Sequence, residues 1–203
     1  MILPMKSQMP FRWMPLLAAI LFAGAVQAHH LPPGFEEVDE FEHQSLLISL
    51  LHPFTGLDHL AAALAAGCLA FAAGRRRGMA MASGFMISLG AGIILGRCGL
   101  ALPMLEQGLA ISVIAAGVLL AVNRGNHLGG IVLPLIGFWH GNAHGVEMNS
   151  IISGLGLFTG TLVAMLTGAG MAWMMLPRFS NAMRFAGGAA MVAGLFMCLS
   201  RFA

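Results

Sequence analysis

Two short clusters of histidines and carboxylates stand out in this chain, because the residues around them are mostly apolar. The first is HPFTGLDH at residues 52–59, and the second is HGNAHGVE at residues 140–147. Their ionisable members are His52, Asp58, His59, His140, His144 and Glu147. Such groups are costly to bury in lipid, so they usually face a bundle interior and mark an ion path or a reactive site. We therefore expect the function to reside in these two clusters.

The second cluster has the spacing of a metal-binding stripe on a helix. If His140 is placed at zero, His144 lies at about 40° and Glu147 at about −20° around the helix axis. An i, i+4 histidine pair can chelate one metal ion, and a carboxylate one turn later can be a third ligand or a partner of a ligand. The spacing therefore predicts that these three side chains project from one face.

The first cluster is less regular because it contains a proline. Pro53 suits the first turn of a helix, so we expect His52 at the helix entrance, near the outer mouth of the site. His59 and Asp58 are then the more deeply embedded members. Asp58 is interpreted either as a ligand or as a group that orients an imidazole, and the sequence leaves both open.

The composition places the chain among membrane proteins. Of its 203 residues, 58% are hydrophobic and only 9% are charged, against roughly 25% charged residues in soluble domains. The mean hydropathy is +0.84. The net charge of +2 is too small to indicate a nucleic-acid partner, so the bilayer is the expected partner surface.

Six apolar blocks predict an all-α fold, a polytopic bundle of six transmembrane helices. They lie at residues 45–73, 78–96, 107–122, 128–148, 151–176 and 182–200, and most approach the length needed to cross ~30 Å of hydrocarbon. The first block is too long for one straight span. Pro53 and Gly56 interrupt it, which predicts a short interfacial helix before the true crossing. Small residues at four-residue spacing, such as Gly92 and Gly96, predict close helix packing.

The N-terminus has the pattern of a cleaved signal peptide. Lys6 and Arg12 precede a short apolar core, and Val26 and Ala28 supply the small residues before a cleavage site. We expect a signal peptide at 1–28, a periplasmic leader at 29–44 and the transmembrane domain at 45–203; a retained anchor helix is the alternative. The leader contains His29, His30 and His43 with five carboxylates, and either captures divalent cations loosely or is simply a solvated polar segment.

The distribution of arginines predicts the orientation. With the mature N-terminus outside, six arginines fall in cytoplasmic connections and two in outer ones or the tail, as the positive-inside rule requires. Both mature ends are then periplasmic, and both histidine clusters lie in the outer half of the membrane, where they can converge. Four histidines with Asp58 and Glu147 would form a nitrogen and oxygen ligand set suited to Ni(II), Co(II) or Zn(II) rather than Cu(I).

Both clusters resemble the signatures of one family of membrane proteins. Residues 52–59 match an H-P-x-x-G-x-D-H pattern and residues 140–147 an H-G-x-A-H-G-x-E pattern, both similar to those of the HupE/UreJ family. The resemblance covers essentially the whole chain. It implies secondary transport of Ni(II), or in some members Co(II), across the bacterial inner membrane, for hydrogenase or urease maturation. It also implies that the six ionisable cluster residues are the functional positions.

The resulting expectation is a metal permease that is not an enzyme, has no prosthetic group and carries Ni(II) or Co(II) as cargo. No Walker A motif (G-x-x-x-x-G-K-[ST]) occurs in the sequence, so we do not expect nucleotide hydrolysis by that route. Two alternatives remain at this stage. One is a zinc-dependent intramembrane hydrolase, and the other is a membrane metal-binding accessory protein.

Overall fold

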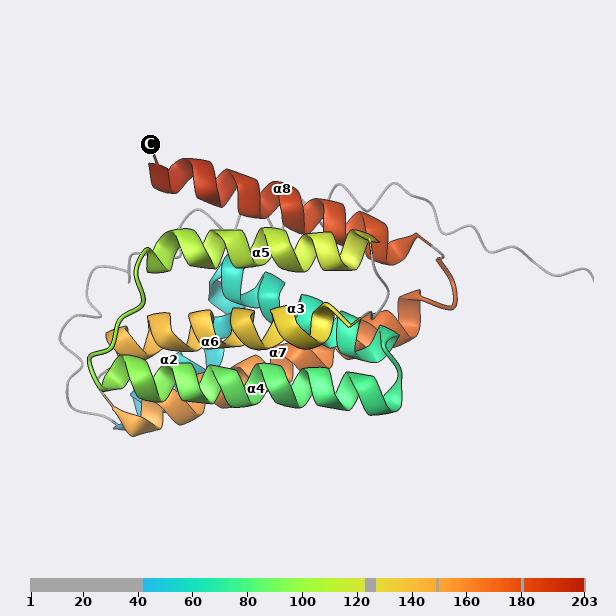
Figure 1. Cartoon of the computed structure of the whole chain (residues 1–203). Helices are drawn as coiled ribbons and strands as arrows, with labels where there is room; N and C mark the ends of the chain where they lie inside the picture. Colours follow the sequence, from blue (N-terminus) through green and yellow to red (C-terminus); the bar gives the residue numbers. More distant parts are fainter. Residues whose placement is uncertain (1–41, 123–126, 149, 180, 203) are drawn as a thin grey trace, which may run out of the picture.

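The computed structural model describes residues 42–122, 127–148, 150–179 and 181–202, which form seven α-helices and no strand (Figure 1). The helices are α2 (Glu42–Thr55), α3 (Leu57–Ala72), α4 (Arg75–Arg97), α5 (Leu105–Val122), α6 (Gly129–Glu147), α7 (Ile151–Met175) and α8 (Ala182–Phe202). The all-α prediction is thus confirmed for this part of the chain. The expected signal peptide and residues 29–41 of the leader lie outside the described residues.

Several of the described helices are long and apolar enough to cross a membrane. Four of them, α4, α5, α7 and α8, meet this condition individually, and the bent pair α2 and α3 raises the number to five if it counts as one span. Large apolar side chains such as Ile87, Ile111 and Leu166 are exposed on the outer faces, where a bilayer would cover them. The chain is therefore a membrane protein by length, composition and surface.

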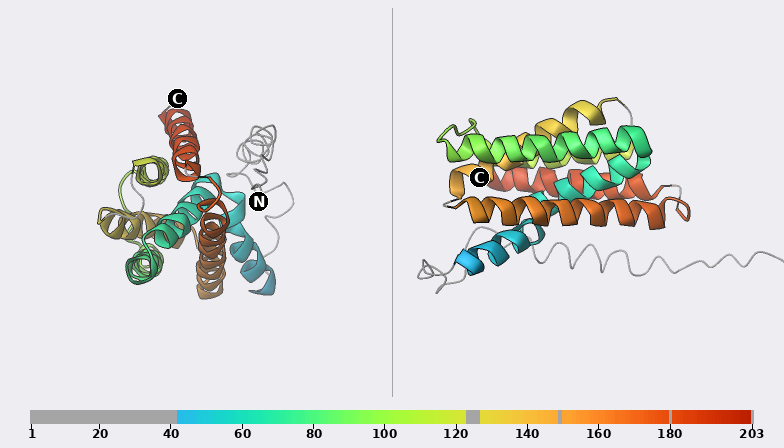
Figure 2. Two further views of the ribbon diagram at one scale, coloured as in Figure 1. Left: turned by 90° about the vertical axis from the view of Figure 1, so that its right-hand side faces the viewer. Right: turned by 90° about the horizontal axis from the view of Figure 1, so that it is seen from below.

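Helix α3 occupies the centre of the bundle. It contacts every other described helix, while α4 packs along α6, α5 along α8, and α7 along both α2 and α3. The two further views show the outer helices arranged around α3 (Figure 2). Four alanines of α3 are almost completely buried, Ala62, Ala63, Ala65 and Ala66. Their small side chains let the neighbouring helices approach closely.

Glycines make the contact between α4 and α6 unusually tight. A Cβ added to Gly137, Gly141 or Gly145 of α6 would overlap a backbone carbonyl of α4. The overlapping carbonyls belong, in order, to Phe85, Leu89 and Ile93. From the other side, Gly92 and Gly96 of α4 pack directly on the α6 backbone, which confirms the predicted small-residue packing. Because α6 is fixed in this way, the direction of its histidines is fixed as well.

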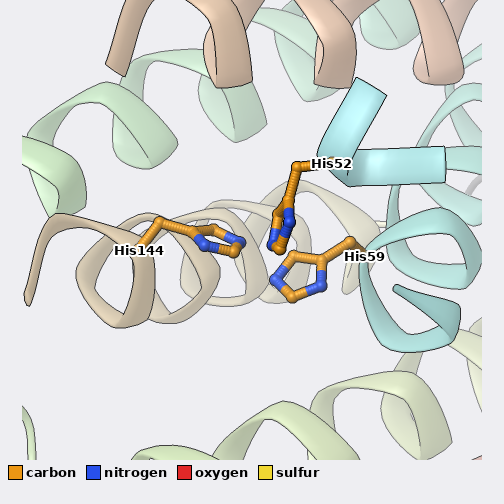
Figure 3. A group of neighbouring side chains, drawn as sticks. All are labelled: His52, His59 and His144. Carbon is orange, nitrogen blue, oxygen red and sulfur yellow. The ribbon is translucent and has the colours of Figure 1, made fainter. Parts of the chain in front are cut away.

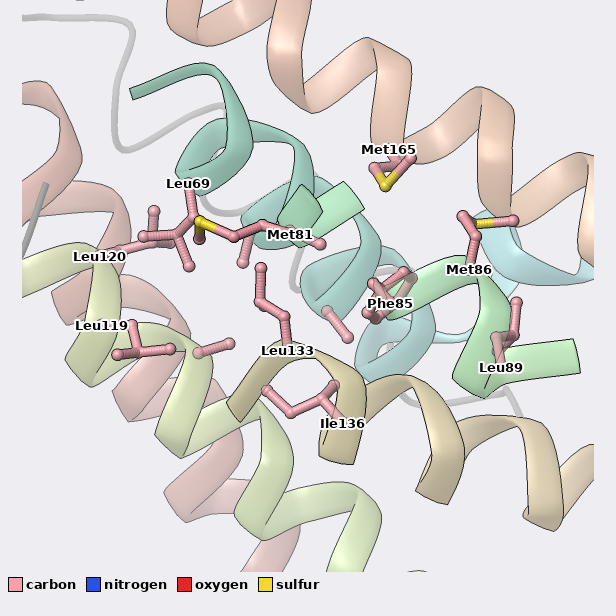
Figure 4. Close-up of a cluster of buried hydrophobic side chains, with 14 of the residues drawn as sticks. Leu69, Met81, Phe85, Met86, Leu89, Leu119, Leu120, Leu133, Ile136 and Met165 are labelled. Atoms are coloured by element: carbon pink, nitrogen blue, oxygen red, sulfur yellow. The ribbon is translucent and has the colours of Figure 1, made fainter. Parts of the chain in front are cut away.

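A cluster of apolar side chains fills the interior of the bundle next to the histidines. It includes Leu69, Met81, Phe85 and Leu133, all nearly inaccessible to solvent (Figure 4). Phe85 and Leu89 belong to this cluster and also line the cavity described below. The polar site is therefore bounded on one side by closely packed apolar side chains.

Candidate metal centre

A sharp break between α2 and α3 positions the first histidine cluster. The two helix segments meet at 79°, and Gly56 between them is buried. A Cβ at Gly56 would lie 2.7 Å from Nδ1 of His59 and 3.1 Å from Oδ1 of Asp58. Glycine is therefore required here for space, because any side chain would displace the polar pair at the start of α3.

The proline of this cluster lies at the end of a helix and not at its beginning. Pro53 is inside α2, and His52 occupies the last turn of that helix. The expectation that His52 precedes the helix is thus wrong. A proline has no N–H to donate to the carbonyl one turn earlier, and α2 continues for only two residues beyond Pro53, to Thr55. The interruption of the long first block, expected at Pro53 and Gly56, falls at Gly56.

Three imidazoles from the two sequence clusters converge at the break. His52, His59 and His144 each offer a ring nitrogen, and these atoms all lie within 4.8 Å of one another (Figure 3). The ring centroid of His144 is 4.1 Å from that of His59 and 4.9 Å from that of His52. His144 is buried, and the other two are partly buried. The expected convergence of the clusters is therefore present in the geometry.

Two ring nitrogens of this group lack the hydrogen-bond partners that buried polar atoms normally have. Within the described residues, Nε2 of His59 and Nε2 of His144 are buried without a hydrogen bond, whereas Nδ1 of His59 faces the Asp58 carboxylate. Leaving a buried polar atom unsatisfied costs about 1–3 kcal/mol. A small cavity lies against these rings, with room for about one water molecule. Its position allows an occupant to accept the lone pairs of the histidines.

His140 lines the same cavity but is held by a hydroxyl group. Its ring centroid is 4.9 Å from that of His59, while its Nε2 lies 2.7 Å from Oγ of the buried Ser112 on α5. His140 does not belong to the group of three. Ser112 was not predicted as a site residue, because a single serine in an apolar span has no distinguishing spacing.

The two cluster carboxylates lie in different surroundings. Asp58 is buried, and its Oδ1 accepts a hydrogen bond of 2.9 Å from the backbone N–H of His59 and lies 2.6 Å from Nδ1 of the same residue. Glu147 is at the end of α6 with its side chain 67% exposed, and its Oε2 is 3.9 Å from Nδ1 of His144. The predicted helical spacing therefore does bring Glu147 near His144, but the Glu147 side chain remains at the surface.

The other predicted residues belong to the leader. His29 and His30 lie outside the described residues, and His43 is in the first turn of α2. Their suggested role in metal capture stays a prediction.

Two further polar residues beside the histidines were missed. Thr161 of α7 is buried and lines the cavity. Asn142 is fully buried; its Nδ2 donates to the carbonyl of Leu100 and its Oδ1 accepts from the N–H of Leu102, both at 2.8 Å. Asn142 thus ties the α4–α5 connection to the helix that carries His140 and His144. Its position inside the second motif was the only signal for it.

Comparison with known proteins gives the family of this chain. The family model described as HupE / UreJ protein matches residues 17–197. The chain belongs to the HupE/UreJ family. A curated relative, Protein HupE of Rhizobium leguminosarum bv. viciae, is 34% identical over 155 residues, which cover 73% of this chain and 81% of the relative. No solved structure matches the chain.

The match to the HupE/UreJ family model covers both histidine clusters, since the matched residues include 52–59 and 140–147. It agrees with the resemblance seen in the two motifs. The structure adds how these motifs meet, through the break between α2 and α3 and the close packing of α6 on α4.

Proposed function

We propose that this HupE/UreJ protein is a secondary transporter that imports Ni(II), with Co(II) as the alternative cargo, across the bacterial inner membrane. The observation that carries the proposal is the group formed by His52, His59 and His144. Imidazole nitrogen is a favourable ligand for Ni(II) and Co(II), and no thiolate is part of this group to favour softer ions. On this proposal the protein has no prosthetic group and catalyses no covalent reaction.

The site has features that suit transport rather than permanent storage of an ion. It sits where a membrane helix is broken, as substrate sites in transporters often do. A permeating ion must be bound strongly enough to lose its waters and weakly enough to leave. Three imidazoles and one nearby buried carboxylate, Asp58, meet this requirement better than a closed cage of carboxylate ligands would.

We further propose six membrane spans with both mature ends in the periplasm. The sixth span is α6, whose 19 residues are long enough to cross but whose last turns carry His140, Asn142 and His144 and so lower its hydropathy. Arg75, Arg76 and Arg77 begin α4 and Arg178 follows α7 at the same end of the bundle (Figure 1). The positive-inside rule makes this the cytoplasmic end, which puts the histidine group in the outer half.

In this arrangement the ion enters from the periplasm. The leader with His29, His30 and His43 captures it, and the paired clusters then replace its waters. It leaves inward past the apolar cluster around Phe85, which must rearrange to let it pass. The cargo then becomes available for hydrogenase or urease maturation. A signal peptide at 1–28 directs the leader to the periplasm.

Uptake by proteoliposomes tests the proposal directly. The purified chain is reconstituted, and accumulation of Ni(II), Co(II), Zn(II) and Mn(II) is compared side by side against protein-free vesicles. We expect Ni(II) or Co(II) to accumulate and Mn(II) to be excluded. Tight stoichiometric binding of the ion without flux would overturn the transport proposal and favour an accessory metal-binding protein. Hydrolysis of a lipid or peptide without any metal flux would overturn it in favour of a zinc enzyme.

A further inference from the structure

The buried contact between Ser112 and His140 joins α5 to the histidine site. The Oγ atom of Ser112 lies 2.7 Å from Nε2 of His140, and both side chains are at least nine-tenths buried. Ser112 is a polar side chain in the otherwise mostly apolar helix α5, and it contacts a cluster histidine directly. The contact therefore brings α5 into the organisation of the site, besides α2, α3, α4, α6 and α7.

The hydrogen bonds of Ser112 determine which nitrogen of His140 carries the proton. The hydroxyl donates its single hydrogen to the carbonyl of Leu109, at 2.7 Å. Because a carbonyl can only accept, this hydrogen is not available for His140. The 2.7 Å contact with Nε2 is then a hydrogen bond only if Nε2–H donates to the serine oxygen. This arrangement corresponds to neutral His140 with its lone pair on Nδ1.

We propose that Ser112 is a positioning residue that holds His140 as the Nε2–H tautomer, so that Nδ1 of His140 is the fourth imidazole ligand of the transported ion. The inference rests on the proposed function, since it concerns the same cargo. His140 lines the cavity with His59 and His144, and its ring is 4.9 Å from that of His59. Binding of the ion through Nδ1 of His140 would take the site from three imidazoles to four.

The chemistry of known metal centres supports this assignment. A histidine that binds a metal through one nitrogen almost always donates the other N–H to a carboxylate, a carbonyl or water, which fixes the tautomer and raises its basicity. In this chain a serine hydroxyl, itself fixed by its own helix through Leu109, supplies that acceptor. Loss of the hydroxyl would remove this acceptor for the proton on Nε2.

The tautomer can be measured without any metal. Full-length protein is labelled with ¹⁵N-histidine, purified metal-free in lipid nanodiscs, and the His140 signals are assigned from their loss in His140→Ala. We expect Nε2 to be protonated in the unsubstituted protein and in Ser112→Thr, which keeps the hydroxyl, and a mixture of tautomers in Ser112→Ala. Protonation of Nδ1 in the unsubstituted protein would overturn the inference, whatever the cargo.

The number of ligands is measured on the loaded protein. X-ray absorption of the Ni(II) or Co(II) complex should show one imidazole fewer in Ser112→Ala than in the unsubstituted protein, and the affinity should fall by about 10–100-fold. Ser88→Ala is the matched control, because Ser88 of α4 bonds only to carbonyls of its own helix in the described contacts. It should retain the full imidazole count.

A double substitution separates positioning from general stability. If Ser112 acts through His140, Ser112→Ala should add no further loss of affinity to His140→Ala. Additive losses, or an unchanged imidazole count in Ser112→Ala, would overturn the inference while leaving metal transport intact. Failure of the unsubstituted protein to bind Ni(II) or Co(II) would instead overturn the proposed function. The two failures are thus distinguishable.

Discussion

The imidazole rings of His59 and His144 lie 4.1 Å apart between centroids, although they come from α3 and α6 and from separate sequence clusters. Neither ring has a hydrogen-bond partner for Nε2 among the described residues. The two rings therefore do not satisfy each other's hydrogen-bonding capacity at Nε2. A cation that accepts a lone pair from each would satisfy both, so metal binding and the relative position of these helices should be coupled.

Removal of either ring should therefore abolish metal accumulation. We expect His59→Ala and His144→Ala each to lower Ni(II) or Co(II) uptake by more than tenfold, because each removes one of three converging ligands. Uptake by cells with matched amounts of membrane-inserted protein is the measurement. His127→Ala is the control, since His127 is exposed in the connection before α6. Normal uptake by both variants, when they are present in the membrane in equal amounts, would contradict the proposed transport function.

The two cluster carboxylates should differ in importance. Asp58 is buried within 2.6 Å of Nδ1 of His59, whereas Glu147 is exposed and 3.9 Å from Nδ1 of His144. We expect Asp58→Asn to weaken metal affinity by about 10–100-fold, as loss of a group that orients a ligand does. Glu147→Gln should have a smaller effect, because water screens an exposed charge. Calorimetric titration with Ni(II) compares them, and equal losses would contradict this order.

Much of the helical layout could be predicted from the sequence, because it depends on local composition. The apolar block at 78–96 corresponds to α4 and the block at 151–176 to α7 within a few residues. The convergence of the two histidine clusters could also be predicted from the sequence, because it required only the number and the direction of the helices. These features depend on patterns that extend over many residues.

The missed features depend on contacts between distant parts of the chain. Ser112 and Thr161 are isolated hydroxyl residues in apolar spans, and only packing brings them to the histidines. The position of the helix break was assigned partly to Pro53, but the chain turns at Gly56, where a side chain would collide with Asp58 and His59. Such steric facts are not visible before the fold is known.

Asn142 should control the order of the α4–α5 connection. Replacing it with alanine removes the partners of the Leu100 carbonyl and the Leu102 N–H. Both contacts are only partly buried, so the cost should be about 0.5–1.5 kcal/mol for each hydrogen bond. We expect the amide of Leu102 to exchange with deuterium much faster in Asn142→Ala. In Asn142→Asp the acceptor for Leu102 remains while the donor to Leu100 is lost, so protection should be intermediate. Unchanged exchange in both variants would refute this role.

The close contact between α3 and α7 gives a stability test away from the histidines. A Cβ at Gly168 would overlap the carbonyl of Leu64 and lie 2.8 Å from its Cα, whereas one at Gly170, on the same helix, would meet nothing within 4 Å. Gly168→Ala should therefore destabilise the fold by about 1–3 kcal/mol, the usual cost of overpacking. Gly170→Ala should be neutral or slightly stabilising, because alanine favours helix over glycine. Thermal unfolding of the two variants in the same detergent measures the difference. If both melt at one temperature, α7 does not pack on α3 as closely as the structure shows.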